Sequence, residues 1–163
     1  MARLLIIYDS RTGGARQMAA AAAEGGRGDG ACDIVMKFAP DAGPDDLLSA
    51  DGYVFAAPEN LAAISGRMKD FFDRSYYPAL GRIEGRPCAL MVCAGSDGEN
   101  AVRQMARIAT GWRLRQAQAP ILVCTHAQTP EQILAPKTIC ETDLARCREL
   151  GAAMAAGLAL GVF

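Results

Sequence analysis

A run of hydroxyl-bearing and glycine residues follows the first apolar segment of this chain. Ser10, Thr12, Gly13 and Gly14 stand immediately before an Ala-rich amphipathic segment. Glycines let the backbone approach an oxyanion closely, and the free N–H groups at the start of a helix attract negative charge. The same residue types are also common in turns and helix caps. The stretch by itself therefore fits an anion cradle and a simple turn equally well.

The spacing within this stretch narrows the kind of anion that it could hold. It does not match GxGxxG, the spacing typical of loops that bind a dinucleotide pyrophosphate. The chain also lacks the GxxxxGK sequence, followed by Ser or Thr, that is typical of nucleoside triphosphate loops. A phosphate monoester is the anion that fits best.

Two further loops combine small and polar residues. The loop at 58–66 reads PENLAAISG, and its backbone could hydrogen-bond to a flat ring, although Ser65 could instead simply cap a helix. The loop at 94–100 reads AGSDGEN, and it too leaves backbone groups free to meet a ligand edge. Here the simpler alternative is that Ser96 or Asp97 caps the helix that follows.

The elements that would position these loops are short apolar runs alternating with helical patterns. Runs of strand length occupy residues 3–8, 32–39, 52–58, 86–94 and 120–124. Five such strands separated by helices predict a parallel sheet covered on both faces. Right-handed crossovers leave two common arrangements, a five-stranded flavodoxin-like order or half of a dinucleotide-binding fold. In either one, ligands bind beyond the carboxyl ends of the strands, where all three loops would lie.

Length and charge bound the class of protein. The 163 residues suffice for one domain, 1–163, and the formal net charge is −1. This balance shows no basic surface for nucleic acid, so no nucleic-acid partner is expected. No apolar run is long enough for membrane insertion, and the uncharged stretch at 151–163 is expected to be a buried terminal helix. The N-terminus does not resemble a signal peptide, so a cytoplasmic location is expected.

Cysteine and histidine content argues against a metal site. The six cysteines are scattered without a CxxC pair, and His126 is the single histidine. Metal sites need ligands at short, regular spacings, which these residues do not provide. We therefore expect free thiols and no bound metal.

Three segments together resemble the flavodoxin-like superfamily, and within it the NAD(P)H:quinone oxidoreductase and NADPH-dependent FMN reductase branches. Residues 10–15, SRTGGA, are similar to a phosphate loop that these proteins share. Residues 58–73, PENLAAISGRMKDFFD, are similar without gaps to a family segment that begins with Pro, and residues 86–96 are similar to its fourth strand and third loop. The resemblance covers essentially the whole chain.

This resemblance implies a three-layer α/β sandwich whose five-stranded parallel sheet has the order 2-1-3-4-5, with helices on both faces. It also implies FMN as the cofactor and NAD(P)H as the electron donor. The implied cofactor-binding residues lie in the three loops. The phosphate would be held by Ser10, Arg11, Thr12, Gly13, Gly14 and Ala15, and the isoalloxazine would lie between Pro58, Glu59, Asn60, Leu61 and Ala62 on one side and Ala94, Gly95 and Ser96 on the other.

The chain departs from the family pattern at three of these positions. Ala15 replaces the last Thr of the phosphate loop, which leaves only its backbone N–H. Leu61 stands where the family usually has Phe or Tyr, and Ala62 where it has Gly. Loss of an aromatic neighbour would weaken flavin affinity or alter its potential.

The resemblance implies an oxidoreductase that passes electrons from NAD(P)H to a quinone or similar small-molecule acceptor, with no side chain acting as a catalytic base. A homo-oligomer is also expected, because related enzymes often complete their sites with a second subunit.

Two alternatives remain open. One is a flavodoxin-type electron carrier without turnover of its own, which the near-neutral charge disfavours. The other is a flavodoxin-like domain that has lost its flavin, which Ala15 and Leu61 keep open.

Five other residues have simpler structural interpretations. Tyr76 and Tyr77 are expected to serve packing, and Trp112 lies on the apolar stripe of a helix. Cys93 is expected to be a buried, unreactive thiol at the end of the fourth strand. His126 could deliver a proton, but a lone histidine without a partner is more often structural.

Overall fold

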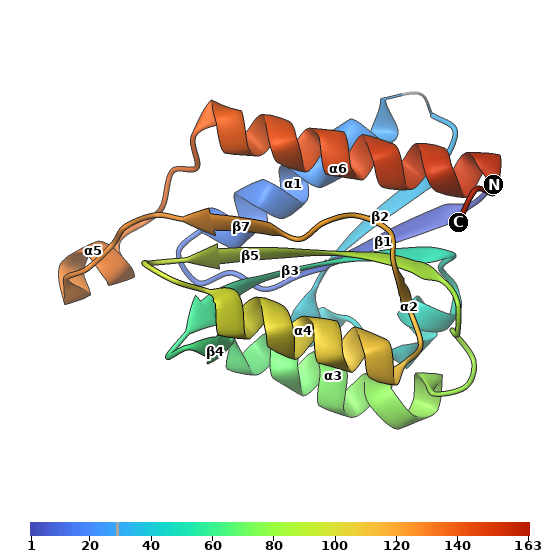
Figure 1. Cartoon of the computed structure of the whole chain (residues 1–163), viewed down its shortest axis with the longest axis horizontal. Coiled ribbons are helices and arrows are strands. Elements are labelled where there is room, and N and C mark those ends of the chain that lie inside the picture. Colours follow the sequence, from blue (N-terminus) through green and yellow to red (C-terminus); the bar gives the residue numbers. More distant parts are fainter. Residues whose placement is uncertain (29) are drawn as a thin grey trace.

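The computed structural model describes residues 1–28 and 30–163. Figure 1 shows three layers, with a central sheet between one pair of helices, α1 and α6, and a second pair, α3 and α4. The two termini lie together at one end of the sheet, and the short helix α5 lies beyond the opposite end. The expected three-layer α/β sandwich is therefore confirmed.

The sheet has seven strands instead of the expected five. They are β1 (Arg3–Tyr8), β2 (Asp33–Phe38), β3 (Gly52–Asn60), β4 (Ala63–Ile64), β5 (Pro87–Ala94), β6 (Arg115–Gln116) and β7 (Ile121–Cys124). The parallel order is β2-β1-β3-β5, and both β6 and β7 pair with β5. The predicted fifth strand, 120–124, is β7, and the two additional strands are β6, which pairs with β5, and β4, which pairs antiparallel to β3. The order otherwise matches 2-1-3-4-5.

The helices are α1 (Gly14–Arg27), α2 (Pro44–Leu48), α3 (Gly66–Ala79), α4 (Glu99–Gly111), α5 (Pro130–Leu134) and α6 (Glu141–Leu160), with a 3-10 turn at Ala39–Asp41. The glycine-rich stretch 25–31 predicts a loop that ends this helix, but α1 continues through Arg27, and Asp29 lies outside the described residues. The sequence predicts a connector marked by Pro78, Gly81 and Gly85, but Pro78 lies inside α3, just before the helix ends at Ala79.

Two apolar cores lie on the two faces of the sheet, because the central strands are apolar on both sides. Four consecutive residues of β1, Leu4 to Ile7, are almost completely buried and alternate between these cores. On the α3/α4 face, Phe55 packs against Phe72 with ring centroids 5.2 Å apart. The predicted core position of Trp112 is confirmed, since it is fully buried there.

The opposite core is built from small side chains, which bring α1 and α6 very close together. A Cβ atom placed on Gly151 of α6 would collide with the backbone of Ala22 in α1. The reciprocal contact lies one turn away, where a Cβ atom on Gly25 would collide with the backbone of Arg148. The two backbones are therefore in direct contact, and α1 is held firmly against α6.

The C-terminal stretch is only partly buried. Met154 and Ala155 face the core, whereas Leu160 and Val162 are exposed. Within the residues that the structure describes, no helix is long and apolar enough to cross a membrane.

Candidate functional site

A cleft of about 270 Å³ opens at the carboxyl ends of the parallel strands. The segments that follow β1, β5 and β7 contribute to its walls, together with the last residues of β3 and β5. Its lining residues are Ser10, Arg11, Thr12, Gly14, Ala15, Pro58, Glu59, Asn60, Cys93, Ala94, Gly95, Thr125, Ala127, Ile133, Leu134 and Lys137. This is the edge of an open α/β sheet at which ligands bind.

The first wall is the anion loop, which we define as residues 10–15. Gly13 has a φ of 95°, a conformation that favours glycine, and its N–H donates to Ser10 Oγ at 3.1 Å. The Ser10 hydroxyl therefore shapes the loop. No side chain of the described residues caps the start of α1, and its first turn holds no acidic residue. The first amide groups of this helix are thus left available for an anion.

Gly14 and Cys93 meet at the floor of the cleft. A Cβ atom on Gly14 would lie 2.5 Å from Cys93 Sγ, so any larger residue at this position requires the thiol or the start of α1 to shift. Burial raises the pKa of the Cys93 thiol to about 11, against the opposing effect of Lys137. Cys93 is therefore protonated near neutral pH and forms part of the wall, as expected of a buried, unreactive thiol.

An ion pair supports the anion loop from beneath. Asp9 is fully buried after β1, and its Oδ1 atom lies 2.7 Å from Arg67 Nη2 at the start of α3. The Ser10 N–H donates to the same oxygen at 2.8 Å. The Arg67 guanidinium also donates to the Ser10 carbonyl and lies 5.0 Å from the centre of the Phe38 ring. The pair thereby fixes the first loop against α3.

The second wall ends in a tight hairpin that joins β3 to β4. Its two central residues, Leu61 and Ala62, have φ angles of 51° and 62°, the left-handed conformation that glycine normally adopts. Each non-glycine residue in that conformation costs about 1–2 kcal/mol. The Leu61 side chain is completely exposed. The expected loop at this place is therefore a strained turn.

Three side chains hold this turn in place. Glu59 Oε1 accepts the Ala62 N–H at 2.8 Å, and Asn100 Nδ2 donates to the Ala62 carbonyl at 2.6 Å. The Ile64 N–H donates to Gln104 Oε1 at 2.8 Å. Ser65 begins α3, but its buried hydroxyl makes no hydrogen bond within the described chain. Ser65 thus occupies the N-cap position of α3, as the simpler alternative expects, but its side chain does not cap the helix. Helix α4 supplies two of the three supports of the turn.

The third wall follows β5 and meets the segment after β7. Asp97 Oδ1 accepts the Glu99 N–H, the first amide of α4, at 3.1 Å, and Ser96 is exposed. The His126 N–H donates to the Gly95 carbonyl at 2.8 Å. His126 is itself exposed, with a φ of 59°, and is not among the residues that line the cleft, so its role stays a prediction.

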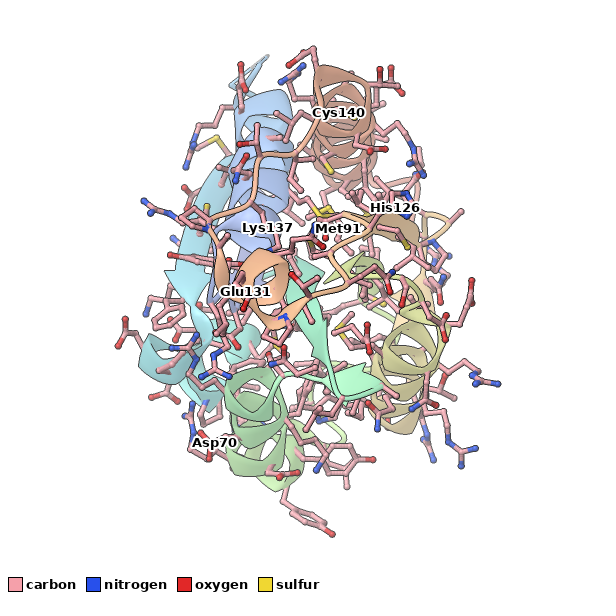
Figure 2. The ribbon with its side chains drawn as sticks, turned by 90° about the vertical axis from the view of Figure 1, so that its left-hand side faces the viewer. Asp70, Met91, His126, Glu131, Lys137 and Cys140 are labelled. Carbon is pink, nitrogen blue, oxygen red and sulfur yellow. The ribbon has the colours of Figure 1, made fainter. Side chains whose placement is uncertain are left out.

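The fourth wall is the segment 127–138, which we name the flap. The sequence assigned it no role, yet Ala127, Ile133, Leu134 and Lys137 line the cleft. Figure 2 shows the flap from the open side, with Glu131 of α5 in front of the strand ends and Lys137 beside it. Lys137 Nζ donates to the carbonyls of Gln132, Ile133 and Ala135 at 2.6–2.9 Å, which closes the C-terminus of α5.

The structure brings most of the predicted cofactor-binding residues to one cleft. Those that line it are Ser10, Arg11, Thr12, Gly14, Ala15, Pro58, Glu59, Asn60, Ala94 and Gly95. Gly13, Leu61, Ala62 and Ser96 lie in the same loops but outside the lining. Their roles remain predictions. Among the described residues, no cluster of potential metal ligands is present.

The order of the parallel strands and the cleft at their carboxyl ends define a flavodoxin-like protein. Two solved structures show the same fold across nearly the whole chain. A flavodoxin from the domain Archaea superposes with a TM-score of 0.77 at 19% identity, covering 96% of this chain and 98% of that one. A flavodoxin, WrbA-like protein from Agrobacterium tumefaciens superposes with a TM-score of 0.71 at 18% identity, covering 99% of both.

The sequence places the chain more narrowly. The family described as NADPH-dependent FMN reductase matches residues 41–129, and the chain belongs to this family. A flavodoxin of Aquifex aeolicus is 36% identical over 107 residues, which are 65% of this chain and 58% of that protein. An NAD(P)H dehydrogenase (quinone) of Acidithiobacillus ferrooxidans is 32% identical over 95 residues, 46% of this chain and 48% of that protein. The chain thus spans about half the length of these curated relatives.

Proposed function

We propose that the chain is an FMN-binding oxidoreductase that passes electrons from NAD(P)H to a quinone or similar small-molecule acceptor. The observation that carries this proposal is the anion loop. It lines the cleft, and the amide groups at the start of α1 beside it have no side-chain cap in the described chain. Membership of the FMN reductase family and the quinone-reducing relative support the same activity. We also propose that residues 1–163 form a single domain, that the protein is a homo-oligomer and that it is located in the cytoplasm.

The residues of the cleft fit FMN. A phosphate monoester suits the anion loop, because Gly13 supplies a positive φ and the first turn of α1 has neither a side-chain cap nor an acidic residue in the described chain. The hydroxyl of Thr12 lies at the same place. Ala15 contributes only a backbone N–H, so the phosphate would depend on main-chain amides more than in a loop that ends in Thr.

FMN, when bound, supplies the hydride and electron chemistry of the reaction. The protein binds, orients and shields it. The anion loop would hold the phosphate, while Pro58, Glu59 and Asn60 border the ring system on one side and Ala94 and Gly95 on the other. Backbone donors at these positions would stabilise negative charge on the ring, so no side chain has to act as a base.

A flavodoxin-type electron carrier is the second candidate, and the Aquifex aeolicus relative favours it. A carrier recognises protein partners, and its docking is usually guided by a strongly one-signed surface. The formal net charge of this chain is only −1, which favours an enzyme with a small substrate.

A spectrum and a turnover assay distinguish these functions. The purified protein is expected to take up FMN and become yellow, and then to oxidise NADH or NADPH continuously once a benzoquinone is added. Reduction by dithionite but not by either nicotinamide would indicate the carrier. A colourless protein that takes up no added FMN would overturn both.

Replacing Thr12 with alanine is expected to weaken FMN binding about tenfold. A hydrogen bond to a charged group contributes about 1.5–3 kcal/mol, part of which the backbone amides would recover. The dissociation constant can be measured by titrating FMN and following flavin fluorescence. The matched control is Thr110→Ala in α4, where an exposed hydroxyl bonds only to the Ala106 carbonyl. An unchanged affinity in Thr12→Ala would contradict the assignment of the anion loop.

A further inference from the structure

The flap is an internally bonded unit that packs loosely on the rest of the molecule. None of the residues of α5 is buried, and Ile133 and Leu134 are 52% and 76% exposed although they line the cleft. Thr129 and Gln132 form a capping box at the start of α5, and Lys137 Nζ closes its end. In the described chain, every hydrogen bond made by residues 128–136 has its partner inside the flap. The flap can therefore move as one piece.

The two ends of the flap are attached to two different walls of the cleft. Before its first residue, the His126 N–H donates to the Gly95 carbonyl of the third wall. At its last turn, the Lys137 N–H donates to the Thr12 carbonyl in the anion loop at 2.8 Å. If the flap moves away from the cleft, it must therefore break its hydrogen bond to the anion loop or turn about its attachment at Gly95.

Gln17, in the first turns of α1, makes the second attachment to the anion-loop side. Its Nε2 atom donates to the Lys137 carbonyl at 2.7 Å and to the Gly13 carbonyl at 2.9 Å, so both amide protons are used. Its Oε1 atom accepts the Ile139 N–H at 3.1 Å. One half-buried side chain thus joins the loop that would hold the phosphate to the segment that covers the cleft.

We propose that Gln17 is a positioning residue that latches the flap over the cleft and thereby slows the release of a bound flavin. Ile133 and Leu134 are then the apolar cover of the cofactor, and the flap must unlatch from Gln17 before FMN leaves. This proposal rests on the proposed function in one respect, which is that the retained ligand is FMN. The attachment of the flap to Gln17 does not depend on which ligand binds.

The test measures flap opening and flavin release separately. In the protein without flavin, Gln17→Ala is expected to accelerate amide hydrogen exchange about tenfold in the peptide 127–139, but not in α3. In the FMN-loaded protein, it is expected to accelerate flavin dissociation about tenfold, followed by flavin fluorescence after rapid dilution. This size corresponds to the loss of one or two neutral hydrogen bonds.

Two further variants sharpen the result. Gln17→Glu keeps the length of the side chain and an acceptor for Ile139, but it cannot donate to the carbonyls of Gly13 and Lys137, so it is expected to accelerate both rates at least as much. Gln116→Ala is the matched control, because Gln116 is exposed and its side chain donates only to the Gln118 carbonyl. It should leave both rates unchanged.

Unchanged exchange in the flap of both Gln17 variants would overturn the latch. Faster exchange with an unchanged rate of FMN dissociation would also overturn it, because the flap would then not retain the ligand. Exchange that accelerates equally in the flap and in α3 would show a general loss of stability instead of a latch. If the unmodified protein binds no FMN, the proposed function fails, and the exchange measurement alone then decides whether Gln17 holds the flap.

Discussion

Replacing Gly151 with alanine is expected to lower the free energy of unfolding by about 3 kcal/mol, at the upper end of the usual cost of overpacking a core. Helix propensity alone gives the opposite sign, because alanine stabilises a helix interior by about 0.8–1 kcal/mol relative to glycine. The packing of the two helices decides the outcome. The new Cβ would collide with backbone atoms of Ala22, which cannot rotate away as a side chain could. Helix α6 would have to move off α1 and expose the core between them.

Urea unfolding followed by circular dichroism measures this change. The matched control is Gly66→Ala, because Gly66 is exposed at the start of α3 and a Cβ atom there meets no other atom within 4 Å. The control is expected to keep or slightly raise the stability. A Gly151→Ala protein as stable as the parent would contradict direct backbone contact between the two helices.

Replacing Gly14 with alanine is expected to weaken FMN binding about a hundredfold, through the loss of two or more charge-assisted hydrogen bonds in the anion loop. The added methyl group would lie 2.5 Å from Cys93 Sγ. Either the thiol turns into the cleft, where the ligand would lie, or the start of α1 shifts and its amides lose their alignment. Alanine is otherwise an excellent residue for a helix, so the collision is the specific cause of the loss.

A second substitution tests that cause directly. In Cys93→Ala the sulfur is gone, and a Cβ atom at position 14 would lie 3.6 Å from the Cβ atom at position 93, an ordinary contact. The double variant Gly14→Ala, Cys93→Ala is therefore expected to bind FMN within a few-fold of the parent. Such a strong coupling between two residues is what a double-mutant cycle detects. Equal losses in the single Gly14 variant and in the double variant would contradict the steric explanation.

The central part of the fold could be predicted from the sequence because its strands are apolar on both faces. β1 has the predicted bounds, 3–8, because it lies between β2 and β3 and is covered on both faces, so that Leu4 to Ile7 are all buried. The two extra short strands could not be predicted in this way. β4 and β6 are only two residues long, and they exist because β3 and β5 extend beside them. Pairings of this length leave no periodicity in the sequence.

The cleft could be predicted only where its residues follow the strands directly. The three predicted loops end up together because parallel strands present their carboxyl ends at one edge. The flap was missed, although Thr129, Pro130 and Gln132 form a recognisable helix start, because α5 has no apolar stripe. The contact between Gln17 and Lys137 joins positions 120 residues apart, so it could not be predicted from a local sequence pattern.

The close packing of α1 on α6 has a consequence at the far end of α1, where the anion loop begins. A helix whose backbone is held against its neighbour behaves as a rigid rod, so the amides at its N-terminus are fixed dipoles. The conformational entropy of ordering them is lost when the chain folds and not when a ligand binds. Glycines remote from the cleft, such as Gly25 and Gly151, are therefore determinants of preorganisation: they contribute to affinity without approaching the ligand.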